Sequence, residues 1–69
     1  MGLPILTITG TNDLCVENYR GMTEYTDQII RLQSKSGQIK ITGKKLEVIY
    51  YTNDEMKIHG QIRTIEYQL

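Results

Sequence analysis

Short stretches in which apolar and polar residues alternate, each followed by a glycine, dominate this chain. Successive side chains of a β-strand point to opposite faces, so residues two apart share a face and are buried together. Because glycine adopts backbone conformations that other residues resist, the pattern predicts strands that stop or bend at the glycine. It occurs three times, as Leu6-Thr7-Ile8-Thr9-Gly10, Ile39-Lys40-Ile41-Thr42-Gly43 and Met56-Lys57-Ile58-His59-Gly60.

Further alternating runs lie between these units. Residues 14–25 predict a hairpin that turns at Arg20-Gly21. Residues 28–34 are short for an isolated helix, and their alternation favours a strand. In 46–51 we expect Leu46, Val48 and Tyr50 to point inward. The step from Ile62 to Ile65 breaks the period of two and predicts a bulge near Arg63-Thr64.

Together these runs predict an all-β fold, a single domain over residues 3–69. We expect seven or eight short antiparallel strands in a meander that forms a small roll, open barrel or sandwich. A short β-solenoid-like stack is the alternative, because a repeated unit is the mark of such folds. The uneven spacing of the three copies argues against it. The interior is expected to hold Leu6, Ile8, Ile39, Ile41, Met56 and Ile58.

Length and charge limit the function. A chain of 69 residues with one cysteine, Cys15, has no internal disulfide, and small folds without such links often gain stability by forming oligomers. The formal net charge is zero and Phe and Trp are absent, which argues against nucleic-acid binding. Arg31, Lys40 and Lys57 with Lys44-Lys45 could still form a basic stripe, although a mixed charged face fits the neighbouring acidic residues better.

The candidate chemistry is sparse. Cys15 and His59 are the only residues of their types, and each is predicted on an outer face. A nucleophilic pair would require them within hydrogen-bond distance. The glycines are isolated at strand ends, not gathered in a phosphate-binding loop. We therefore expect no catalytic, metal-binding or cofactor-binding residues and no enzyme, and a pocket that joined His59 to Cys15 would change that expectation.

Aromatic and apolar residues at outward positions are the best candidates for a functional surface. Tyrosine suits protein interfaces because its ring is apolar and its tip is polar. Ile49 and Tyr51 are predicted on the outer face of their strand, and Tyr19 and Tyr25 lie in the predicted hairpin. We interpret Tyr19, Tyr25, Ile49 and Tyr51 as a possible contact patch, with ordinary half-exposed tyrosine packing as the alternative.

Several motifs occur in an order that resembles a known family. The most specific is Val16-Glu17-Asn18-Tyr19-Arg20-Gly21, preceded by Leu3-Pro4 and Ile8-Thr9-Gly10. Glu24-Tyr25-Thr26, Ile30-Arg31-Leu32, Gly37, Ile41-Thr42-Gly43-Lys44 and Leu46 follow, and then the stretches Asp54 to Ile62 and Ile65-Glu66-Tyr67. Over nearly the whole chain from Leu3, this order is similar to the YabP/YqfC family of sporulation proteins, and to its YqfC branch in particular.

The resemblance implies a cytoplasmic protein made in the mother cell of endospore-forming bacteria, with no established activity and no known site residues. It implies a sporulation membrane protein as partner, and a short polar N-terminal extension that this sequence lacks. A second copy is the other expected partner, because the small size and zero net charge favour self-association. No apolar run approaches the roughly 20 residues of a membrane-spanning helix. We therefore expect a non-enzymatic interaction or assembly module. The alternatives are a small β-barrel that binds a ligand or single-stranded nucleic acid, and an enzyme.

Overall fold

The structure, a computed structural model, describes residues 3–68 and consists of strands and turns. The six strands form one antiparallel sheet in the order β1-β2-β6-β5-β4-β3. Their bounds are β1 Ile5–Thr9, β2 Asp13–Glu17, β3 Tyr19–Tyr25, β4 Ile29–Ser34, β5 Gly37–Tyr51 and β6 Glu55–Gln68. The all-β prediction is confirmed, including a strand, not a helix, within residues 28–34. Leu69, the last residue of the predicted domain, lies outside the described residues.

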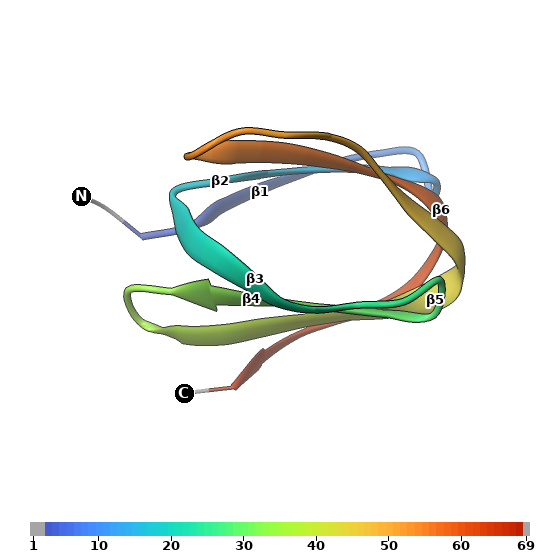
Figure 1. The fold of residues 1–69 in the computed structure, drawn as a ribbon. Coiled ribbons are helices and arrows are strands. Elements are labelled where there is room, and N and C mark those ends of the chain that lie inside the picture. The colour runs from blue at the N-terminus through green and yellow to red at the C-terminus, as the bar shows by residue number, and fades with distance from the viewer. Residues whose placement is uncertain (1–2, 69) are drawn as a thin grey trace.

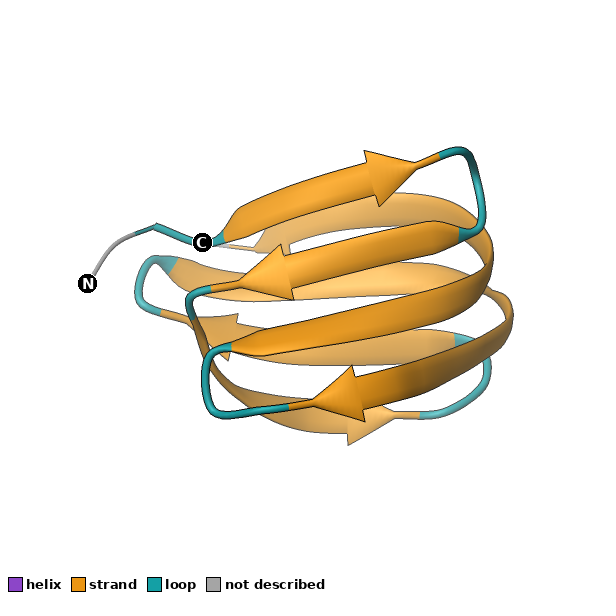
Figure 2. Cartoon of the chain, turned by 90° about the horizontal axis from the view of Figure 1, so that it is seen from above, coloured by secondary structure: helices purple, strands orange, loops and turns teal. Residues whose placement is uncertain are grey.

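The sheet curls into two layers because its two longest strands bend (Figure 1). β1, β2, the first half of β6 and the second half of β5 form the first layer. β3, β4, the first half of β5 and the second half of β6 form the second layer. Figure 2 shows the strands of one layer lying over those of the other. The result is a small roll, one of the three forms that the alternation left open.

The bends lie at two of the three repeated glycines, and they explain the strand count. β5 continues through Gly43 and β6 through Gly60, so each long strand joins two of the shorter predicted ones. Six strands therefore replace the predicted seven or eight. In the first copy, Gly10 ends the strand with a φ of 64°.

Each bend is tied to a distant turn. The Gly43 N–H donates to the Gln28 carbonyl at 3.0 Å, and the Gly60 N–H donates to the Asn12 carbonyl at 3.0 Å. A Cβ at position 43 would overlap the carbonyl oxygen of Gln61, and a Cβ at position 60 would lie 2.5 Å from the carbonyl oxygen of Lys45. The two bent strands thus cross so closely that only glycine fits at either position.

The pairing of β2 differs from the prediction. Residues 14–25 do not form a hairpin, because β2 pairs with β1 and β6, whereas β3 pairs with β4. The break falls at Asn18, whose φ of 67° is a left-handed conformation that asparagine tolerates better than most residues. The Asn18 N–H donates to the Asp54 carbonyl at 2.9 Å, which ties this turn to the β5–β6 turn. Strands β3 to β6 form the predicted meander, and β1–β2 joins its far side. This antiparallel order excludes the solenoid-like stack.

The observed burial agrees with the predicted interior in the second and third repeats and differs from it in the first. Ile39, Ile41, Met56 and Ile58 are fully buried. In the first repeat, Leu6 is half-buried and Ile8 is 54% exposed, because β1 is an edge strand with little of the opposite layer above it. The buried apolar residues are Leu14, Val16, Tyr19, Ile30, Leu32, Ile39, Ile41, Leu46, Met56 and Ile58.

The predicted bulge near Arg63 is confirmed. Thr42 lies opposite Thr64 and Gly43 lies opposite Ile62, so Arg63 is an extra residue on β6. A second irregularity shifts the register between Val48 and Tyr50 and leaves Ile49 unpaired on β5. Bulges of this kind bend a strand and increase its twist, which helps the sheet to curl.

Candidate interaction surfaces

The exposed large apolar side chains gather mainly along two lines where edges of the curled sheet face each other. On one side, β3 faces the second half of β5. Tyr25 is 47% exposed, Ile49 51% and Tyr51 50%, and we call these three residues the tyrosine seam. The Val48 N–H donates to the Tyr25 hydroxyl at 3.0 Å, which fixes Tyr25 of β3 against β5. Three of the four residues predicted as a contact patch therefore lie on one side of the molecule.

Tyr19, the fourth residue of the predicted patch, is not an outward residue. It is buried, and the break at Asn18 restarts the alternation so that Tyr19 points inward. Its hydroxyl donates to the carbonyl oxygen of Thr52 and lies 3.1 Å from that of Glu55. The Tyr19 ring stacks on Tyr51 with the centroids 5.8 Å apart. Tyr19 therefore supports the tyrosine seam from beneath.

Tyr50 and Tyr51 have exchanged faces relative to the prediction. Because Ile49 is the extra residue of a bulge, Tyr50 lies opposite Lys57 on the outer face, and Tyr51 lies opposite the buried Met56. The alternation alone had placed Tyr50 inside and Tyr51 outside. Ile49 is exposed, as predicted, and the bulge directs it away from the core.

The Tyr19 hydroxyl makes stability depend on pH. Burial raises the pKa of this hydroxyl to about 12, and the neighbouring Tyr51, Asp54 and Glu55 add to the effect. Because the folded chain holds the proton more tightly than the unfolded chain, this contribution is complete below about pH 10 and is lost as the pH rises toward 12.

We expect Tyr19→Phe to lower the free energy of unfolding at neutral pH by about 1 kcal/mol, through the lost hydrogen bond. It should also flatten the fall in stability above about pH 10. Urea denaturation at a series of pH values measures both effects. Tyr67→Phe, at an exposed position on β6, is the matched control. An unchanged pH dependence in Tyr19→Phe would contradict the assignment.

A second line of apolar residues borders the other side of the roll, where β1 faces the second half of β6. Ile8, Ile62 and Ile65 line a hollow of about 230 Å³ at one end. Leu3, Pro4 and Tyr67 line another at the opposite end. We call these six residues the open seam. Sequence reasoning missed this seam, because it placed Ile8 in the interior and had no signal for which strands form the edges. Ile62 and Ile65 are half-buried and pack against the core from this side.

A polar cluster covers the outer face of the first layer. The Cys15 thiol donates to Glu55 Oε2 at 3.4 Å, and the Tyr50 hydroxyl donates to the same oxygen at 3.1 Å. Burial and then the Glu55 carboxylate raise the pKa of the Cys15 thiol, so it stays protonated and poorly nucleophilic at neutral pH. His59 Nδ1 lies 2.9 Å from Asp13 Oδ1. Cys15 and His59 thus have different carboxylate partners and do not form a pair.

Two comparisons with known proteins agree on the family. The YabP family profile matches residues 4–69. The uncharacterized protein YqfC of Bacillus subtilis is 31% identical over 67 residues, which cover 97% of this chain and 72% of that protein. The chain belongs to the YabP/YqfC family. The family is associated with sporulation. No solved structure matches the chain.

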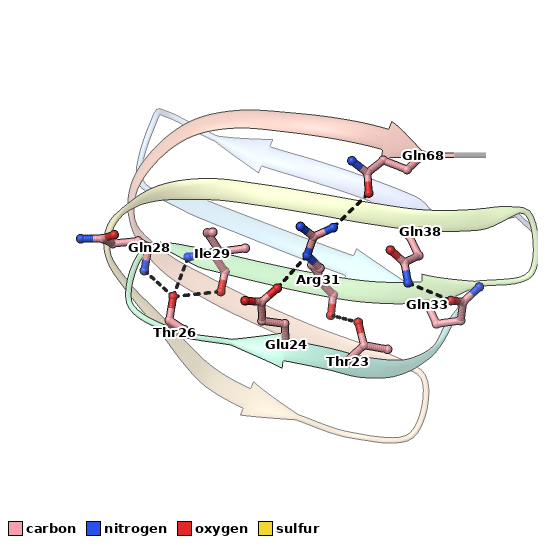
Figure 3. Close-up of polar contacts among 9 residues, drawn as sticks. All are labelled: Thr23, Glu24, Thr26, Gln28, Ile29, Arg31, Gln33, Gln38 and Gln68. Atoms are coloured by element: carbon pink, nitrogen blue, oxygen red, sulfur yellow. Dashed lines mark hydrogen bonds and ion pairs between the residues drawn. The ribbon is translucent and has the colours of Figure 1, made fainter.

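In this YabP/YqfC protein the basic residues do not form the stripe that the sequence allowed. Arg31 lies on the outer face of the second layer, where its Nε is 2.7 Å from Glu24 Oε1 and its guanidinium donates to Gln68 at 3.1 Å (Figure 3). Lys40 lies opposite Glu66. Lys57 belongs to the other layer, opposite Cys15. Acidic neighbours therefore interrupt the positive charge, which weakens the case for nucleic-acid binding.

Residues 3–68 hold neither a metal-binding cluster nor a membrane-spanning helix. Within this range, no three His, Cys, Asp or Glu side chains converge in a way that could hold a metal ion. The same range contains no helix with the length and apolar character required to cross a membrane.

Proposed function

We propose that this YabP/YqfC chain is a non-enzymatic interaction module that acts in spore formation and contacts its partner through the tyrosine seam. The observation that carries the proposal is the convergence of Tyr25, Ile49 and Tyr51. All three are about half exposed, although the Val48 backbone N–H holds Tyr25 in place and the Tyr19 ring holds Tyr51. Aromatic residues fixed in this way lose little conformational freedom on binding, which favours association.

Other features support a binding role over catalysis. The Cys15 thiol is held protonated beside Glu55, and His59 is engaged by Asp13 on a face open to solvent. Neither arrangement supplies an activated nucleophile with a base to assist it. Arg31 is neutralised by Glu24, which argues against the nucleic-acid alternative. We propose the mother-cell cytoplasm as its location, with a sporulation membrane protein as partner.

A photo-crosslinking amino acid at Ile49 tests this function in sporulating cells. We expect position 49 to give a covalent adduct with a membrane-fraction protein, identified by mass spectrometry. The same probe at Thr23, an exposed residue on β3, is the matched control. The change should leave the fold intact, because Ile49 is an unpaired bulge residue with half of its surface in water. Equal labelling from positions 49 and 23 would refute the proposal.

A further inference from the structure

The edge strand β1 is unprotected, unlike the edge at β3. Within residues 3–68, β1 pairs with β2 alone. It carries no charged residue between Ile5 and Thr9, whereas β3 carries Arg20 and Glu24 and two register shifts. Charges and bulges are the features by which proteins keep sheet edges from pairing with other chains. β1 therefore presents a short, regular and uncharged row of backbone donors and acceptors.

The sequence of β1 is complementary to itself in the antiparallel direction. If two copies pair about a two-fold axis at Thr7, each Thr7 faces the other Thr7 on the outer side of the sheet. Leu6 of one copy then faces Ile8 of the second copy on the inner side. Cross-strand pairs of like character, Thr with Thr and apolar with apolar, stabilise antiparallel sheets. This register pairs Thr7 with Thr7 and Leu6 with Ile8 at the centre of the strand, and it leaves Ile5 opposite Thr9 only at the strand ends.

We propose that two copies of the chain associate through antiparallel pairing of their β1 strands about Thr7. The two six-stranded sheets then become one continuous sheet, and the inner residues of the added strand extend over the open seam. Ile8, which is 54% exposed in the single chain, is covered by the second copy's Leu6. This inference names one partner, a second copy, for the interaction module proposed above, and in that sense rests on that proposal.

The charge distribution favours a second copy as the occupant. The acidic residues nearest to β1 on the outer face are Asp13 and Glu17 of β2. In the paired sheet, two β1 strands separate the two β2 strands, which therefore lie roughly 14 Å apart at the usual strand spacing. That distance exceeds the Debye length of about 8 Å at physiological salt, so repulsion between the β2 carboxylates is small. With a formal net charge of zero, the chain also lacks a general barrier to self-association.

Charge variants at Thr7 test the two-fold register. Thr7 is exposed on the outer face, so Thr7→Lys and Thr7→Glu should fold normally. Each variant alone places two like charges opposite each other, and we expect its dimerisation to weaken by at least about tenfold relative to the unmodified chain. An equal mixture of the two should recover the dimer, because position 7 then faces its opposite charge. Thr23→Lys on β3 is the matched control and should dimerise normally.

Sedimentation velocity over a concentration series measures these affinities, and circular dichroism checks the fold of each variant. Thr7→Cys in a Cys15→Ser background adds a geometric test, since directly paired antiparallel residues have Cα separations of about 4.5–5.5 Å, within disulfide range. We expect a covalent dimer on mild oxidation, and none from Thr23→Cys in the same background.

A monomer at all concentrations, a Thr7→Lys dimer as tight as that of the unmodified chain, or a mixture that stays monomeric would overturn the β1 dimer. The two proposals fail separately. A chain that is monomeric but crosslinks a membrane protein from position 49 overturns the dimer and keeps the proposed function. A chain that dimerises as described but gives no specific adduct from position 49 supports the dimer and refutes the proposed contact.

Discussion

Replacement of Gly43 or Gly60 by alanine is expected to leave the chain largely unfolded at room temperature. A Cβ at position 43 would overlap the Gln61 carbonyl, and at position 60 it would approach the backbone of Lys45 and Leu46 while φ is 145°. The atoms in the way are backbone, which cannot turn aside as a flexible side chain can. We expect each substitution to cost about 3–5 kcal/mol, comparable to the whole stability that one core supplies in so small a fold.

Gly21→Ala is the control for this prediction. Gly21 lies in β3, and a Cβ at this position would have no atom within 4 Å. The φ angle of Gly21 is not positive, so alanine can adopt its backbone conformation. Alanine there should change the free energy of unfolding by no more than about 1 kcal/mol. Urea denaturation followed by circular dichroism measures all three variants. A cooperative transition of normal midpoint in Gly43→Ala would show that the two bent strands can separate without cost.

The second large effect is expected from the isoleucines of the repeated units. Ile58→Ala should lower the free energy of unfolding by about 2–5 kcal/mol, because Ile58 is fully buried and its removal leaves a cavity. Ile8 occupies the same place in the first repeat but is 54% exposed, so Ile8→Ala should cost less than about 1 kcal/mol.

Chemical denaturation measures the free energy of unfolding of both variants, at a protein concentration too low for self-association. Dilution matters because Ile8 would gain a packing partner in the proposed dimer. Equal losses of stability in Ile8→Ala and Ile58→Ala would contradict the described burial of the first layer.

The alternation of apolar and polar residues predicted correctly which side chains are buried on the central strands. It failed for the edge strand β1. Ile39 and Ile41 lie on a strand with neighbours on both sides, so one face of it must be buried. Ile8 has the same alternation, but β1 lies at the end of the sheet, and alternation carries no information about strand order. The pairing of Leu14 with Ile58 joins residues far apart in sequence, which local patterns cannot reveal.

The candidate surface was predicted in part for a related reason. A period of two identified Ile49 as exposed, and the structure agrees. The same period placed Tyr50 inside and Tyr51 outside, because it assumed an unbroken strand through the bulge at Ile49. At Tyr19 the left-handed Asn18 restarted the alternation, and asparagine in a strand-rich stretch was the one local signal of that break.

The partnership between β2 and β6 also has a consequence for how the protein is made. β2 leaves the ribosome before β6 (Glu55–Gln68), the strand against which it packs, because β3, β4 and β5 lie between them in the sequence. An isolated two-stranded hairpin is only marginally stable in water, so β1 and β2 have no lasting docking place until β6 has been synthesised. The β1–β2 hairpin therefore remains without its partner strand during synthesis until β6 emerges.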